Sequence, residues 1–152
     1  MMIKRVAMGL GAATVLGAAA GMASAAEAPA GYVKNVTGEV RVISAGEAAR
    51  AAVGSPVAAG STLKTAANSS VGISLRDNTL LSLGPNTEFT LSEFAFDPGE
   101  GKLSLASRLT RGTLDYVSGV IARLRPEAVS VATPSSTLAV RGTHFVVKVE
   151  GE

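Results

Sequence analysis

The only histidine of the chain is the first residue to consider for chemistry, because catalytic triads and many metal sites use a histidine with a positioned partner. His144 lies between Thr143 and Phe145, on the parity opposite to Phe145, Val147 and Val149. In a strand this alternation sends the apolar residues to a core and His144 to solvent. Nothing near it supplies the spacing of a triad, so His144 is predicted to be a surface strand residue.

Hydroxyl and carboxylate side chains give no stronger indication of chemistry. The serine pairs at 69–70 and 135–136 lie outside a Gly-x-Ser-x-Gly elbow and are typical of turns. The acidic residues are scattered, without an Asp-x-Asp-x-Asp-Gly calcium loop, and the chain has no cysteine, which excludes a disulfide framework. The sequence therefore predicts no catalytic, metal or cofactor site, and a protein that is not an enzyme.

Residues 1–25 have the three-part order of a cleaved secretory signal peptide. Lys4 and Arg5 form a positive start, an apolar uncharged run follows at 6–20, and small residues end the segment. Cleavage is expected after Ala25, with a cut one residue later as the alternative. A retained membrane anchor is disfavoured, because the apolar run is shorter than the roughly 20 residues that span a bilayer. We therefore expect a periplasmic or secreted protein.

Charge argues against two classes of partner. The chain has 14 Lys and Arg against 12 Asp and Glu. Removing Lys4 and Arg5 with the signal leaves a mature charge near zero, whereas nucleic acids and anionic membranes need a net basic face. We expect no nucleic-acid partner and no membrane span after cleavage.

The mature chain has the pattern of short strands joined by tight turns. Glycine and proline recur throughout, and apolar residues alternate with polar ones, for example at 71–75 and 145–149. This predicts one all-β domain over 32–150, after a linker at 26–31. Because an edge strand such as the one at 145–149 could pair with another chain, the oligomeric state stays open.

Two segments do not fit a simple strand. Residues 117–125 could form a single helical turn or a loop before Pro126. Residues 47–53 are rich in alanine and could be helical by propensity, although the segment is too short to be a stable helix alone.

Five motifs follow one another from residue 36 to residue 145, and the resemblance that they carry extends from about Gly38 to Val149. They are VTGEV at 36–40, GSTLKT at 60–65, DNTLLSLGPNT at 77–87, RGTL at 111–114, and VATP at 131–134 running into VRGTHF at 140–145. In order and spacing they resemble the FecR domain family of bacterial extracytoplasmic proteins. The ending, with its Thr-Pro and Val-Arg-Gly-Thr-x-Phe, is the most specific element.

The resemblance implies an all-β fold, expected to be a flattened β-solenoid or roll of short strands, with a two-layer β-sandwich as the alternative. The namesakes of the family are transmembrane regulators of iron uptake, in which a cytoplasmic anti-sigma segment precedes a membrane helix and the FecR domain lies in the periplasm. There the domain receives a signal from an outer-membrane receptor.

This sequence shows no anti-sigma segment before the domain and stops at Glu152, just past it. We therefore expect a stand-alone, secreted FecR domain: a non-enzymatic module that binds a protein partner in the cell envelope, in signalling related to iron-uptake regulation. The alternative is a structural module associated with the cell wall through peptidoglycan or another glycan.

Two sets of residues are singled out within this domain. The triplets Arg111-Gly112-Thr113 and Arg141-Gly142-Thr143 each precede an apolar strand and are predicted to be two equivalent structural corners, since glycine permits a tight bend. Phe94 and Phe96, with Leu91, form either an exposed docking strip or part of the core.

Overall fold

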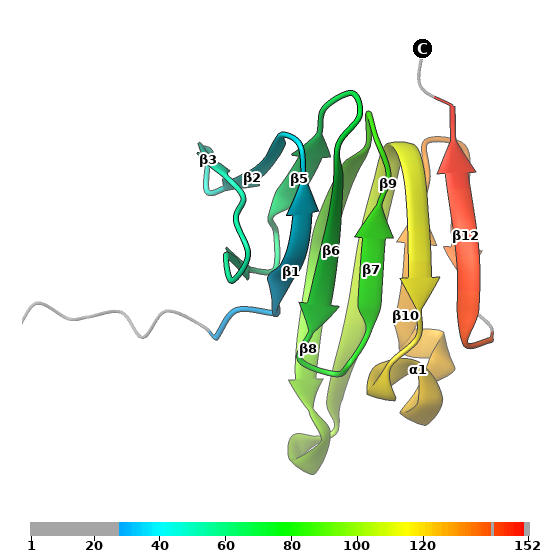
Figure 1. Cartoon of the computed structure of the whole chain (residues 1–152). Coiled ribbons are helices and arrows are strands. Elements are labelled where there is room, and N and C mark those ends of the chain that lie inside the picture. Colours follow the sequence, from blue (N-terminus) through cyan, green and yellow to red (C-terminus); the bar gives the residue numbers. More distant parts are fainter. Residues whose placement is uncertain (1–27, 141, 151–152) are drawn as a thin grey trace, which may run out of the picture.

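The computed structural model describes residues 28–140 and 142–150, so the predicted signal peptide lies outside the described residues. The described part contains twelve strands, one short helix and two 3-10 turns (Figure 1). The elements are β1 (Gly31–Thr37), β2 (Val40–Ser44), β3 (Glu47–Arg50), β4 (Pro56–Val57), β5 (Thr62–Thr65), β6 (Ser70–Leu75), β7 (Leu80–Leu83), β8 (Glu88–Asp97), η1 (Pro98–Glu100), β9 (Lys102–Val117), α1 (Val120–Leu124), η2 (Pro126–Ala128), β10 (Val129–Ala132), β11 (Thr137–Ala139) and β12 (His144–Val149). No helix among them is long and apolar enough to cross a membrane.

The strands form one curled, open, largely antiparallel sheet, a half-barrel with two facing halves, which confirms the predicted all-β class. The front half runs β4-β1-β6-β7-β9-β12, and the back half runs β3-β2-β5-β8-β9-β10-β11 (Figure 1). Among these pairs, β9 and β10 are parallel. The long strand β9 belongs to both halves: residues up to Arg111 pair with β8, and later residues pair with β7 and β12.

The core lies between the two halves and follows the predicted alternation. Large side chains from the front, such as Ile73, Leu81 and Leu114, and from the back, such as Leu63 and Phe89, are fully buried in one cluster. Burial of this apolar surface stabilises the packing of the two halves by roughly 25 cal/mol of free energy for each Å² removed from water.

Two segments that the sequence left open are resolved by tertiary context. The alanine-rich segment contains a strand, not a helix: Glu47–Arg50 pairs with β2 as a hairpin. Its turn places Ala45 and Gly46 at positive φ of 51° and 81°, as a tight hairpin requires. The segment before Pro126 contains one helical turn, α1.

Candidate functional site

The outer end of the β8–β9 hairpin carries the predicted docking strip. It projects beyond the rest of the sheet at the bottom of Figure 1 and ends in η1. Leu91 is fully buried, so it cannot contact a partner, whereas Phe94 and Phe96 are half-buried and pack against the edge of the core. The two phenylalanines thus remain the part of the strip that a partner could reach.

A register irregularity explains why these three side chains share one face. Residues 91 and 94 have opposite parity, which in a regular strand would place them on opposite faces. The register shifts between Leu91 and Glu93, so that Leu91 lies opposite Ser107 while Phe94 lies opposite Leu105. Ser107 and Leu105 are both buried, so the extra residue returns Phe94 to the inner face.

A cation covers Phe94. The Arg76 guanidinium lies 5.4 Å from the centre of the Phe94 ring, within the range of a cation–π contact. Arg76 follows β6 in the front half, and its Nε donates a hydrogen bond to the Pro29 carbonyl at 2.9 Å. The start of the domain, the front half and the back hairpin therefore meet at this arginine.

Beside this contact lies a hollow of about 320 Å³. Four small residues line it together with the arginine and the phenylalanine; they are Ala28, Ala30, Ala58 and Ala59. Methyl groups and an aromatic ring accept an apolar side chain, and an exposed guanidinium accepts a carboxylate. The arrangement can hold a short segment of another protein, with one apolar anchor beside one acidic group.

Comparison with known proteins agrees with the sequence motifs. Residues 61–152, more than half of the chain, match the family model described as FecR protein. The chain belongs to the FecR family. No curated protein and no solved structure matches it. The family is a regulatory one, related to signalling in iron uptake.

Within this FecR domain, the matched region includes β8, β9 and Arg76, but not the four alanines of the hollow. The sequence did not single out Arg76. Its Arg-Asp-Asn-Thr setting indicates a turn, and only the meeting of the two sheet halves brings it to Phe94.

The other sequence candidates lie elsewhere in the FecR domain. His144 is exposed as predicted, and its Nε2 lies 2.7 Å from Asp115 Oδ1 on the neighbouring strand β9. Ser136 closes the β10–β11 turn with Thr133, and Ser69 binds the backbone of its own turn. Among the described residues no group of three or more potential metal ligands gathers.

The glycines of the two Arg-Gly-Thr triplets share a positive φ but not their surroundings. Gly112 and Gly142 have nearly the same positive φ, +96° and +98°. Gly112 packs against Thr87, whose Oγ1 accepts a hydrogen bond from the Thr113 N–H at 3.1 Å, whereas a Cβ at Gly142 would meet no atom of the described residues within 4 Å. Arg141 lies outside the described residues. The equivalence of the two corners stays a prediction.

A buried carboxylate, which the sequence counted among scattered acids, organises the end of the half-barrel. Asp77 is fully buried. Its carboxylate accepts hydrogen bonds from the Thr79 N–H at 3.1 Å, the Thr79 hydroxyl at 2.8 Å and the Ile121 N–H at 3.2 Å. These bonds fix the first turn of α1 against the front half. The nearby Tyr116 hydroxyl is buried without a hydrogen-bond partner, and this burial, together with the Asp77 charge, raises the pKa of Tyr116.

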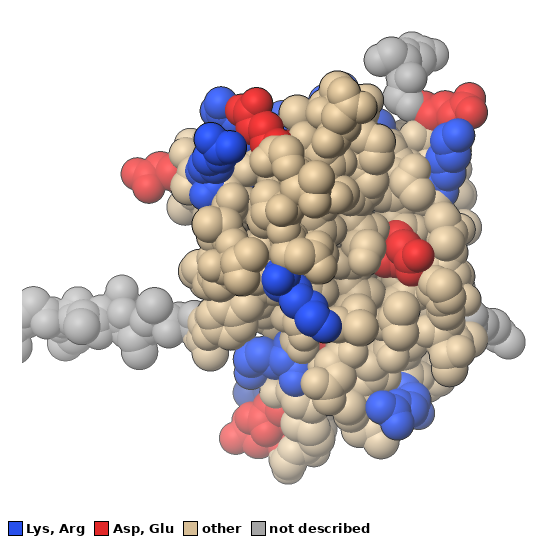
Figure 2. All heavy atoms as spheres, viewed as in Figure 1, with Lys and Arg blue, Asp and Glu red and all other residues tan. Residues whose placement is uncertain are grey.

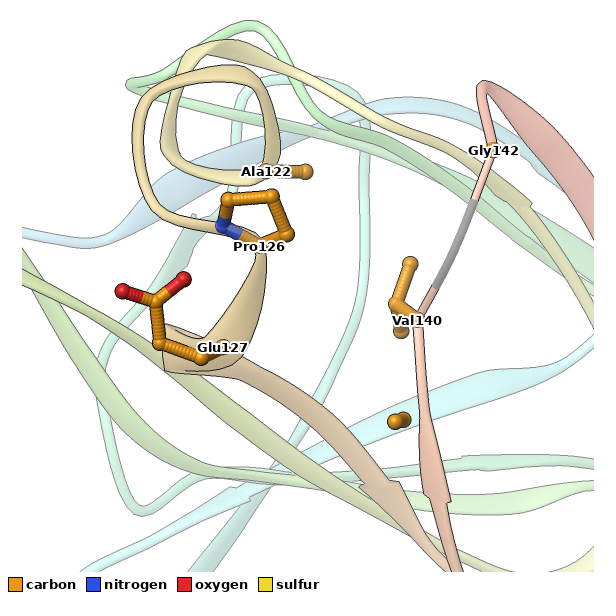
Figure 3. A pocket seen from close by; sticks show the side chains of 6 residues that line it. Ala122, Pro126, Glu127, Val140 and Gly142 are labelled. Carbon is orange, nitrogen blue, oxygen red and sulfur yellow. The ribbon is translucent and has the colours of Figure 1, made fainter.

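A second hollow, of about 510 Å³, lies between the α1–η2 segment and the chain that joins β11 to β12 (Figure 3). Small and apolar residues line most of it, including Ala122, Pro126 and Val140. Figure 3 shows the Glu127 carboxylate turned away from Val140. Nothing in this lining pairs a nucleophile with a base.

Proposed function

We propose that this chain is a non-enzymatic, extracytoplasmic FecR module that binds a protein partner in the cell envelope and acts in signalling related to iron-uptake regulation. The family membership supports a signalling role. The signal-peptide pattern of residues 1–25 supports export to the periplasm or beyond.

The observation that carries the binding role is the hollow at the projecting hairpin. Phe94 and Phe96 are only half-buried, and Arg76 holds an exposed positive charge over the ring. Aromatic residues and arginine are the side chains that most often dominate protein–protein binding energy. Figure 2 shows that the middle of the viewed face carries few charged side chains, which gather mostly toward its margins.

The experiment is site-specific photocrosslinking in the envelope of the protein's own cell. A photoreactive phenylalanine analogue replaces Phe96, and in a control chain it replaces Val53, which is 71% exposed in the loop before β4. We expect position 96 to crosslink to one defined envelope protein and position 53 to give no such product.

A charge variant tests the arginine. Arg76→Gln removes the cation over Phe94, and Arg50→Gln removes an exposed arginine on β3 as the matched control. We expect only Arg76→Gln to weaken the crosslink at position 96. Equal crosslinking from positions 53 and 96, or recovery of wall material alone, would move the assignment to a structural, wall-associated module.

A further inference from the structure

The half-barrel ends in four edge strands, and three of them are protected against pairing with another chain. β4 has two residues, one of them Pro56, and β11 has three. β3 has four residues with Glu47 and Arg50 at its ends. Short length, proline and charge are the usual means by which edge strands avoid other strands. β12 is longer, with six residues, and Lys148 is its single lysine or arginine.

Among the described residues, no strand pairs with the second side of β12. The strand pairs with β9 on one side, through the register from His144↔Val117 to Val149↔Gly112. A hollow of about 600 Å³ is lined by the end of β12, from Val147 to Glu150, and by the β10–β11 turn. Val146 in the middle of the strand is 59% exposed, so the outer face of β12 is apolar at its centre.

We propose that β12 is a self-association edge, on which β12 of a second copy pairs antiparallel about a two-fold axis at Val147. An antiparallel pair with such symmetry places residue i opposite residue 294 − i, and both strands keep their inner and outer faces. Val146 then lies opposite Lys148 of the second copy, and His144 lies opposite Glu150. The front half of the sheet becomes continuous through both copies. This inference does not depend on the proposed function.

Charge selects this register among its neighbours. An axis at Lys148 would place two lysines opposite each other, and an axis at Val146 would place His144 opposite Lys148 and leave Glu150 without His144 as its partner. Like charges directly opposite in a sheet are destabilising, and opposite ones stabilise. With the axis at Val147 no like charges face each other, residues 145–149 of the two copies pair with one another, and His144 faces Glu150 just past the end of β12.

His144 already has one carboxylate partner within its own chain. Its Nε2 contacts Asp115 Oδ1 at 2.7 Å, which leaves Nδ1 for a second acceptor. Glu150 is exposed, and in this register its carboxylate would come from the second copy. Each dimer would contain two such carboxylate–histidine–carboxylate sets.

The test begins with sedimentation equilibrium of the exported protein. We expect a monomer–dimer equilibrium that Val146→Lys weakens on the order of tenfold, since each dimer gains two lysine–lysine pairs. In the folded monomer the new lysine faces Asp115, so its fold should be preserved. Val53→Lys, the same change at an exposed valine in a loop, should leave the equilibrium unchanged. Adding Lys148→Glu to Val146→Lys should restore the dimer, because each new lysine then faces a glutamate.

The register can be mapped directly because the chain has no cysteine. Opposite Cα atoms lie about 4.5–5.5 Å apart, within disulfide range, whereas diagonal positions lie about 7–8 Å apart. A mixture of Val146→Cys and Lys148→Cys chains should therefore form mixed disulfide dimers, and either variant alone should not. A protein that stays monomeric at its highest soluble concentration, a dimer indifferent to Val146→Lys, or self-crosslinking of either single variant would overturn the proposal. A monomer whose β12 crosslinks to a different envelope protein would assign the edge to that protein instead.

Discussion

Gly112 offers the sharpest test of how the long strand β9 passes between the two halves of the sheet. Gly112→Ala adds a methyl group at φ +96°, in contact with the Thr87 hydroxyl and 2.5 Å from the Thr87 Cα. Gly142→Ala adds the same group at φ +98° with nothing described within 4 Å. The two glycines therefore differ in crowding while their φ angles are nearly the same.

The expected magnitudes follow from this difference. A left-handed conformation costs a residue with a Cβ roughly 1–2 kcal/mol, which applies to both variants. Overpacking adds roughly 1–3 kcal/mol more, and only Gly112→Ala incurs it. The displaced Thr87 hydroxyl would also lose its bonds to the Thr113 N–H and the Pro85 carbonyl. We expect losses of about 2–5 kcal/mol for Gly112→Ala and about 1–2 kcal/mol for Gly142→Ala.

Urea unfolding followed by far-UV circular dichroism measures the free energy of unfolding of each variant. The comparison requires that this free energy falls with urea concentration at the same slope in the wild type and the variants. Losses of 2–5 kcal/mol are a large share of the 5–15 kcal/mol typical of a domain, so the difference between the variants is measurable. If Gly142→Ala destabilises as much as Gly112→Ala, crowding at Thr87 is not what makes Gly112 necessary.

Three further predictions concern other parts of the chain. Asp77→Ala leaves the buried Thr79 and Ile121 N–H groups without acceptors and should lower the free energy of unfolding by about 2–4 kcal/mol in the same assay. Tyr116→Phe removes an unpaired buried hydroxyl and should leave the free energy of unfolding unchanged or slightly raised near pH 7. Because burial raises the pKa of Tyr116, the wild type loses stability as the pH rises above about 10, and the variant should lose less in an alkaline unfolding experiment. Mass spectrometry of the exported protein should find Ala26 as its first residue, and an intact N-terminus would contradict the signal peptide.

The strand pattern of this domain could be predicted because its period is local. Val71, Ile73 and Leu75 alternate in the sequence and are all buried. The strand Glu47–Arg50 could not be predicted from propensity, since its alanines favour a helix. Pairing with β2 overrides that preference, as the Ala45-Gly46 turn brings the two segments together.

The candidate site was only partly predictable, because its contacts also depend on how distant strands pair. Phe94 and Phe96 were visible as an aromatic pair, but the irregularity after Leu91 depends on what lies opposite in β9. Arg76 is distant from Phe94 in sequence, and its position over the ring needs the front and back halves to be in place. Family resemblance predicted the class of the fold and left these contacts open.

The long strand β9 connects the two proposed surfaces without making them overlap. Its first part pairs with β8 and supports Phe94, and its last part, from Gly112, pairs with β12. Figure 1 shows the hairpin tip at the bottom and β12 at the right edge. A second copy on β12 would leave the hollow beside Arg76 free and present it twice. A partner with two docking segments would then bind the dimer more tightly than the monomer by avidity, with no change at the hollow itself. Comparing wild type with Val146→Lys would separate the two effects, because the variant should weaken binding only to such a bivalent partner.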